Sequence, residues 1–157
     1  MNEEVPREVP RFAADRMLAR LARWLRLLGA DVRCEPALGG AELLRLARED
    51  GRILLTRDKR LRTARDVYLV ASDRFRDQLC EVLARFPFDT RRSAFTRCSH
   101  CNHKLGEVSR ELVRRRVPPF VYASHDRFAQ CPGCGRVYWA ATHPERILGE
   151  LKSIGLW

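Results

Sequence analysis

The sequence lacks any run of about 18 apolar residues, the length that a membrane-spanning helix needs. Residues 1–6 also lack the basic start and the apolar core of a secretory signal. We therefore expect a soluble protein of the cytoplasm without a membrane partner. With 157 residues, 45% of them hydrophobic and 32% charged, the chain is long enough for one core and one small appendage.

Acidic residues are the minority among the charged ones. Twenty acidic residues stand against 30 basic ones, which leaves a net charge of +10 and favours a polyanionic partner, first of all nucleic acid. Lysine is scarce, and arginine supplies almost all of the positive charge; its forked guanidinium suits phosphate better than an ammonium does. The other interpretation is a solvated, charge-rich surface or a codon bias.

A short apolar run at residues 53–55 is followed by Thr56, Arg57 and Asp58. The pattern predicts a buried parallel strand, whose carboxyl end faces the crevice where ligands bind in open α/β sheets. Residues 11–14 have the same form and lead to Asp15. We therefore expect two strands to bring Asp15 and Asp58 together.

Strand and helix patterns alternate along the first part of the chain. The expected strands cover 11–14, 30–34, 52–56 and 67–71, and the expected helical segments cover 15–28, 41–50, 58–65 and 72–86. Alternation of this kind predicts an α/β fold with a parallel sheet and helices on its faces. All strands then end at one edge, which gathers Asp15, Asp58 and Asp73 there, with Glu42 in reach at a helix start.

Each of these strand-end aspartates is also a good N-cap for the helix that follows it. A single aspartate at such a position is more simply explained as a helix cap than as a metal ligand. Three at equivalent strand ends of a basic protein favour a metal site, because clustered carboxylates repel one another unless a cation relieves them. Mg²⁺ or Mn²⁺ is the expected cation, since both are hard and bind oxygen.

The first expected helix carries apolar residues at helical spacing, at Leu18, Leu21, Leu25 and Leu28. Four arginines lie off this stripe, where they face either solvent or a phosphate backbone: Arg16, Arg20, Arg23 and Arg26.

The alternation stops at Pro87, and a different segment follows. Two Cys-x-x-Cys motifs predict one tetrahedral zinc ion, held by Cys98, Cys101, Cys131 and Cys134. Four thiolates leave no open coordination position, so the zinc is expected to be structural. The expected domains are a loose leader at 1–10, the α/β domain at 11–90 and a zinc ribbon with its C-terminal tail at 91–157.

Between and after the two motifs the sequence predicts three further pieces. Residues 108–116 are expected to be helical or irregular, residues 117–122 to form an extended arm, and residues 137–139 to complete a β-ribbon.

These motifs together resemble the PIN-like ribonuclease domain known as the C-terminal domain of Mut-seven-type exonucleases, which also occurs in small proteins with a zinc ribbon. The resemblance spans about residues 12–146 and lies in residues 15–18, 21–29, 55–58, 78–79, 117–119, 137–139 and the two cysteine motifs. It implies a PIN-like fold, divalent-metal-dependent RNase activity and RNA as the substrate. The family often carries another acid just before the second helix, where this chain has Gly39 and Gly40.

We therefore expect a metal-dependent ribonuclease. Asp15 and Asp58, helped by Glu42 and Asp73, are expected to hold one or two Mg²⁺ or Mn²⁺ ions, and the expected RNA contacts are Thr56, Arg57, Arg16, Arg20 and Arg23. Two alternatives stay open. A non-catalytic RNA-binding or ribosome-associated adaptor is favoured by the missing acid at Gly39 and Gly40, and a toxin-like PIN RNase ranks third because that class usually lacks a ribbon.

Overall fold

The computed structural model describes residues 8–139 and 143–155. The chain divides into two compact units, Met1–Asn102 and His103–Trp157. Residues 1–7 of the expected leader lie outside the described residues, and residues 8–10 form no helix or strand. The domain boundary expected at residue 90 stays a prediction. No helix in the described ranges is long and apolar enough to cross a membrane.

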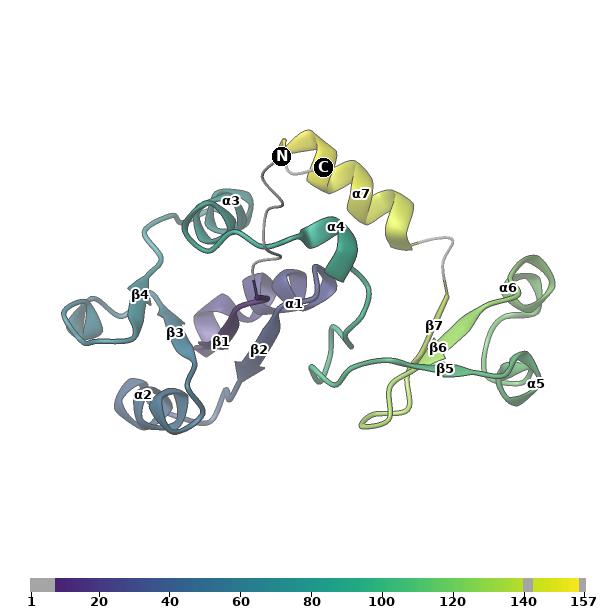
Figure 1. Ribbon diagram of the computed structural model, residues 1–157, viewed down its shortest axis with the longest axis horizontal. Helices are drawn as coiled ribbons and strands as arrows, with labels where there is room; N and C mark the ends of the chain where they lie inside the picture. Colours follow the sequence, from purple (N-terminus) through teal and green to yellow (C-terminus); the bar gives the residue numbers. More distant parts are fainter. Residues whose placement is uncertain (1–7, 140–142, 156–157) are drawn as a thin grey trace, which may run out of the picture. The chain divides into compact units, whose positions relative to one another are not determined.

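The first unit is built on a four-stranded parallel sheet with the order β2-β1-β3-β4 (Figure 1). Its strands are β1 (Arg11–Ala14), β2 (Asp31–Cys34), β3 (Ile53–Thr56) and β4 (Val67–Leu69). The predicted parallel α/β sheet is confirmed, although β4 ends earlier than expected. Because β1 pairs with both β2 and β3, chain order reverses between β1 and β3, and such a switch point is where open α/β sheets bind ligands.

Helices and helical turns connect these strands. They are η1 (Arg16–Leu18), α1 (Ala19–Leu27), α2 (Gly40–Glu49), η2 (Lys59–Leu61), α3 (Phe75–Arg85) and α4 (Thr90–Ser93). Two expectations are wrong. The helix expected at 58–65 is only a 3₁₀ turn, and α3 begins at Phe75 rather than at residue 72. The Glu81 carboxylate binds the backbone N–H groups of Ala71 (2.9 Å) and Ser72 (3.0 Å), which holds this segment as a loop.

Alternating side chains of β1 face opposite sides of the sheet. Phe12 packs edge-on against Phe86, which directly follows α3, with ring centroids 5.4 Å apart. Ala13 belongs instead to a buried cluster with Leu54 and with Leu43 of α2. Helix α2 therefore covers the face opposite to α1 and α3, as Figure 1 shows. The predicted apolar stripe of α1 is confirmed, because Leu18, Leu21, Leu25 and Leu28 are buried.

Arg26 was expected on the exposed side of its helix, and this expectation is wrong. Its residue is only 8% exposed. Arg26 follows the buried Ala22 by one helical turn, so both lie on the same side of α1. Carbonyl groups from two other segments satisfy the guanidinium there, and such pairing is what allows a charged side chain to be buried.

The second unit contains a three-stranded antiparallel sheet with the order β5-β6-β7. Its strands are β5 (Gly106–Val108), β6 (Phe128–Gln130) and β7 (Val137–Trp139), and its helices are α5 (Arg110–Val113), α6 (Pro119–Ser124) and α7 (His143–Ser153). The predicted β-ribbon, with a strand at residues 137–139, is confirmed.

The extended arm expected at 117–122 is wrong, because most of that stretch belongs to α6. Pro119 stands in the first turn of this helix, where a proline is favoured because its missing N–H needs no partner there. Val117 and Val121 enter the core of the unit with Val113 and Phe128. The burial of these valines explains why the segment is helical although it contains two prolines.

Candidate active site and metal centre

Asp15 directly follows β1, and hydrogen bonds fix both of its carboxylate oxygens. Oδ1 accepts from the backbone N–H groups of Met17 (2.9 Å) and Leu18 (3.2 Å), so Asp15 caps η1. Oδ2 accepts from the hydroxyl of Thr56 (2.6 Å) and from the backbone N–H of Arg57 (3.4 Å). The carboxylate therefore reaches from the end of β1 to the end of β3.

Thr56 connects the two strand-end acids. Its side chain ends β3 and is buried, with 1% of the residue exposed. The hydroxyl donates to Asp15 and accepts from the backbone N–H of Asp58 at 3.0 Å. One buried hydroxyl thus ties Asp15 to the segment that carries Asp58, at the switch point of the sheet.

Asp58 follows β3 and is covered by Arg60. Its Oδ1 accepts from the backbone N–H and the Nε of Arg60, both at 3.0 Å, and its Oδ2 accepts from Nη2 at 2.8 Å. The hydrogen bonds from the side chain and backbone of Arg60 lower the pKa of Asp58. Sequence reasoning missed Arg60; a basic residue two positions after a strand-end acid is the signal that points to it.

The start of α2 comes close to Asp58. A Cβ atom on Gly40 would lie 3.4 Å from Oδ2 of Asp58 and 3.1 Å from a methyl group of Leu61. Glu42 has a different partner, because its Oε2 accepts from the backbone N–H of Gly39 at 3.3 Å. The glutamate thus stabilises the first turn of α2.

Asp73 lies in the loop before α3 and forms an ion pair with Arg57. Arg57 also donates to the carbonyl of Ser72 at 2.6 Å, and Gln78 donates to the same carbonyl at 3.0 Å. The Asp73 side chain is 85% exposed, and Arg74 rather than Asp73 is the N-cap of α3. Asp73 therefore contacts the site through Arg57.

Each of the four predicted carboxylates already accepts a hydrogen bond from the protein. Within the described residues, three or more possible metal ligands come within 4.8 Å of one another only at the four cysteines. Asp15 and Asp58 are linked through Thr56, whereas Glu42 caps a helix and Asp73 pairs with Arg57. Their catalytic assignment stays a prediction.

The arginines expected to bind RNA lie on η1 and α1. Arg16, Arg20 and Arg23 are exposed, as is the side chain of Met17 beside Asp15. The Arg20 guanidinium lies 4.4 Å from the ring centroid of Phe75, which in turn lies 5.3 Å from the ring of Trp24. Cationic and aromatic groups thus adjoin each other on α1 and α3.

The two Cys-x-x-Cys motifs bring four sulfur atoms together. The Sγ atoms of Cys98, Cys101, Cys131 and Cys134 all lie within 4.8 Å of one another. A tetrahedral zinc with Zn–S bonds of about 2.3 Å needs sulfurs about 3.8 Å apart, a spacing that this limit accommodates. This group can hold a metal ion and is compatible with a zinc ribbon.

Both motifs end in the same type of turn. The backbone N–H of Asn102 donates to the carbonyl of Cys98 at 3.0 Å, and that of Gly135 donates to Cys131 at 2.9 Å. Asn102 and Gly135 share a φ of +73°, a left-handed conformation that asparagine and glycine adopt most readily. In the second motif the N–H of Cys134 also points at the Cys131 sulfur, 3.4 Å away.

Comparisons with curated proteins and with solved structures find no match. A family model for the Mut7-C RNAse domain matches residues 10–151, from the residue before β1 into α7. The match covers most of the chain and includes the parallel sheet, Asp15, Asp58 and all four motif cysteines. The chain therefore belongs to the Mut7-C RNAse domain family.

Proposed function

We propose that this protein is a divalent-metal-dependent ribonuclease whose active site is built on Asp15 and Asp58. The observation that carries the proposal is the buried Thr56 hydroxyl, which ties Asp15 to the Asp58 segment at the switch point of a parallel sheet. Membership of an RNAse domain family supports RNA as the substrate.

The donor set suits a hard cation, because it offers carboxylate oxygens and a hydroxyl. Asp15 and Asp58 would hold Mg²⁺ or Mn²⁺, with Glu42 and Asp73 as more distant acids. Such an ion activates water and stabilises the charge on the attacked phosphate. Thr56 and the backbone N–H of Arg57 orient the Asp15 carboxylate.

Arg57 is the proposed phosphate ligand beside these acids. Its guanidinium is held by Asp73 and by the carbonyl of Ser72. The Asp73 side chain is 85% exposed, so its ion pair with Arg57 is weak. A phosphate that approaches from solvent can therefore replace Asp73 as the partner of Arg57. Asp73 is then a positioning residue for Arg57.

The proposed RNA surface continues along η1 and α1. Arg16, Arg20 and Arg23 supply charge for the phosphate backbone, and the half-buried rings of Phe75 and Trp24 beside Arg20 offer apolar surface to unpaired bases. Neither feature reads base edges, so binding is expected to tolerate many sequences.

The metal at the four cysteines is proposed to be one structural zinc ion per chain. Thiolate sulfur favours zinc over magnesium or manganese, and four thiolates leave no position for water. The zinc therefore takes no part in the proposed cleavage.

The test replaces Asp15 or Asp58 by asparagine, which keeps the size and the ability to cap a turn. We expect each variant to lose Mn²⁺-dependent RNA cleavage to below detection while it keeps its fold and its RNA affinity. Glu49→Gln, at the exposed end of α2, is the matched control and should cleave normally. Full activity of purified Asp58→Asn protein would falsify the mechanism.

A non-catalytic RNA-binding adaptor is the second candidate, and the pairing of Asp58 with Arg60 favours it, because the acid already has a cationic partner. An adaptor has no cleavage to lose. It should also gain no thermal stability from millimolar Mn²⁺, whereas a protein that binds the ion in its folded state is stabilised by it.

A further inference from the structure

Arg26 of α1 lies between the edge of the parallel sheet and the first cysteine motif. Its Nε donates to the carbonyl of Val32 in β2 at 2.8 Å. Its Nη1 donates to the carbonyls of Ser99 (3.3 Å) and His100 (2.8 Å), the two residues between Cys98 and Cys101. The guanidinium therefore fixes the backbone on which two metal ligands are mounted.

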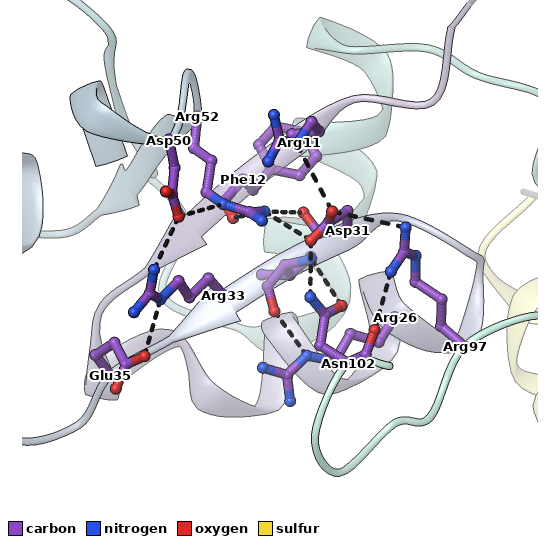
Figure 2. Close-up of polar contacts among 11 residues, drawn as sticks. Arg11, Phe12, Arg26, Asp31, Arg33, Glu35, Asp50, Arg52, Arg97 and Asn102 are labelled. Atoms are coloured by element: carbon purple, nitrogen blue, oxygen red, sulfur yellow. Dashed lines mark hydrogen bonds and ion pairs between the residues drawn. The ribbon is translucent and has the colours of Figure 1, made fainter. Parts of the chain in front are cut away.

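Asn102 anchors the end of the same motif. Its Oδ1 accepts from the backbone N–H of Val32 at 3.0 Å, and its Nδ2 donates to Asp31 at 2.7 Å. Arg97, just before the motif, donates to the Asn102 carbonyl at 2.9 Å and pairs with Asp31 at 3.6 Å. Figure 2 shows Asp31 at the centre of these contacts.

The charge balance of this network is favourable. Burial raises the pKa of Asp31, but the hydrogen bonds from Arg52 and Asn102 outweigh it, so the carboxylate stays ionised. Arg26 supplies a buried positive charge at the carbonyls of Ser99 and His100, inside the first cysteine motif. A zinc ion with four thiolates carries a net negative charge, and a fixed guanidinium nearby compensates part of it.

Strand β2 is an edge of the sheet, since within the described part of the chain it pairs with β1 alone. Unpaired N–H and C=O groups on an edge strand invite association with other chains. At Val32 both groups are occupied, the carbonyl by Arg26 and the N–H by Asn102. The side chains of Arg26 and Asn102 therefore connect the first cysteine motif to the edge of the sheet.

We propose that Arg26 and Asn102 are positioning residues for the metal centre: they hold the first Cys-x-x-Cys turn ready for its metal by anchoring it to β2, and metal binding in return protects this sheet edge. The inference rests on the four-cysteine metal site and is independent of the nuclease activity. Its reciprocity follows from linkage, because two sites coupled through one contact affect each other equally.

The first experiment measures zinc affinity of the full chain by competition with a chelator, and reads the ligand geometry from the visible absorption of bound Co²⁺. Arg26→Met should weaken zinc binding by about tenfold or more, the usual effect of removing a group that orients metal ligands. Arg26→Lys, which keeps the charge but loses the fork, should fall between this variant and the wild type.

A second variant keeps the test decisive if Arg26→Met fails to fold. Asn102→Gly keeps the left-handed turn but removes both side-chain contacts, and we expect it to weaken zinc binding as well. Arg45→Met, at an exposed position of α2, is the matched control and should bind zinc as the wild type does. If folded Arg26→Met, Arg26→Lys and Asn102→Gly all bind zinc with wild-type affinity, the proposal is overturned.

The reciprocal effect is read from hydrogen exchange of single amides. Removal of zinc from the wild type should speed exchange at Val32 at least severalfold and leave Leu54, in the interior strand β3, unchanged. In Asn102→Gly the Val32 amide should exchange rapidly with or without zinc. A Val32 amide that stays equally protected after zinc removal contradicts the coupling.

Discussion

Asp15 and Asp58 occupy equivalent strand ends but are stabilised in different ways. Asp15 accepts hydrogen bonds from the buried Thr56 hydroxyl and from backbone N–H groups, and the fold holds all of these donors in place. Asp58 accepts from the side chain of Arg60, of which 89% is exposed. At the scale of single residues the first acid is fixed and the second has a replaceable partner.

Thr56 is the residue on which the arrangement of both acids depends. Thr56→Val removes the hydroxyl at nearly constant volume and leaves Asp15 and the Asp58 N–H each without one partner. We expect the free energy of unfolding to fall by about 1–3 kcal/mol, the cost of a buried polar group that loses its hydrogen bond. Chemical denaturation measures this change.

Thr56→Ser is the control, since it keeps the hydroxyl. It should retain cleavage activity, whereas Thr56→Val should lose it. Equal stability and activity of the two variants would show that the hydroxyl has no such role.

At the scale of secondary structure, the sequence predicts best the segments whose burial follows a simple period. The four strands and the apolar stripe of α1 are of this kind. Sequence reasoning missed α6, although Val113, Val117 and Val121 recur every fourth residue and are buried together with Phe128. Arg26 was misassigned for another reason: the carbonyls that satisfy it come from β2 and from the first cysteine motif, which the periodicity of α1 does not show.

The candidate site was predictable to the same degree. Strand ends place Asp15 and Asp58, and the spacing of the cysteines picks out the four side chains that could hold a metal ion. The partners of the carboxylates, such as Arg60 on Asp58 and Gly39 on Glu42, depend on side-chain geometry that periodicity does not contain.

The end of α1 gives a prediction about how two elements meet. Gly29 has a φ of +96°, and a Cβ atom there would lie 2.2 Å from the carbonyl oxygen of Ser93 in α4. Gly29→Ala should therefore lower the melting temperature through both backbone strain, about 1–3 kcal/mol, and displacement of α4.

Gly51→Ala is the matched control for Gly29→Ala. Gly51 follows α2 with a φ of +61°, and nothing lies within 4 Å of the added Cβ. It should show the backbone strain alone. Equal losses of melting temperature in the two variants would mean that α1 and α4 do not approach each other this closely.

At the scale of the whole molecule, we expect the net charge of +10 to set the salt dependence of RNA affinity. Affinity for single-stranded RNA should fall as salt rises, with a slope of about −0.7 in log–log form for each phosphate contacted. Arg16→Gln and Arg20→Gln should each reduce the slope by about this amount, and Arg45→Gln on α2 should not. Filter binding or fluorescence anisotropy over a salt series measures the slope, and affinity that is independent of salt contradicts the proposed surface.

The cover that Arg60 forms over Asp58 has a consequence for how the proposed nuclease takes up its ion. A cation tethered two residues away has an effective concentration on the order of millimolar, and a dissolved ion must compete with it. In the proposed nuclease, Asp58 would exchange one cation for another, with a divalent ion taking the place of the guanidinium. The released guanidinium would then be free to pair with a phosphate of the RNA, so that loading the ion would also prepare a contact for the substrate.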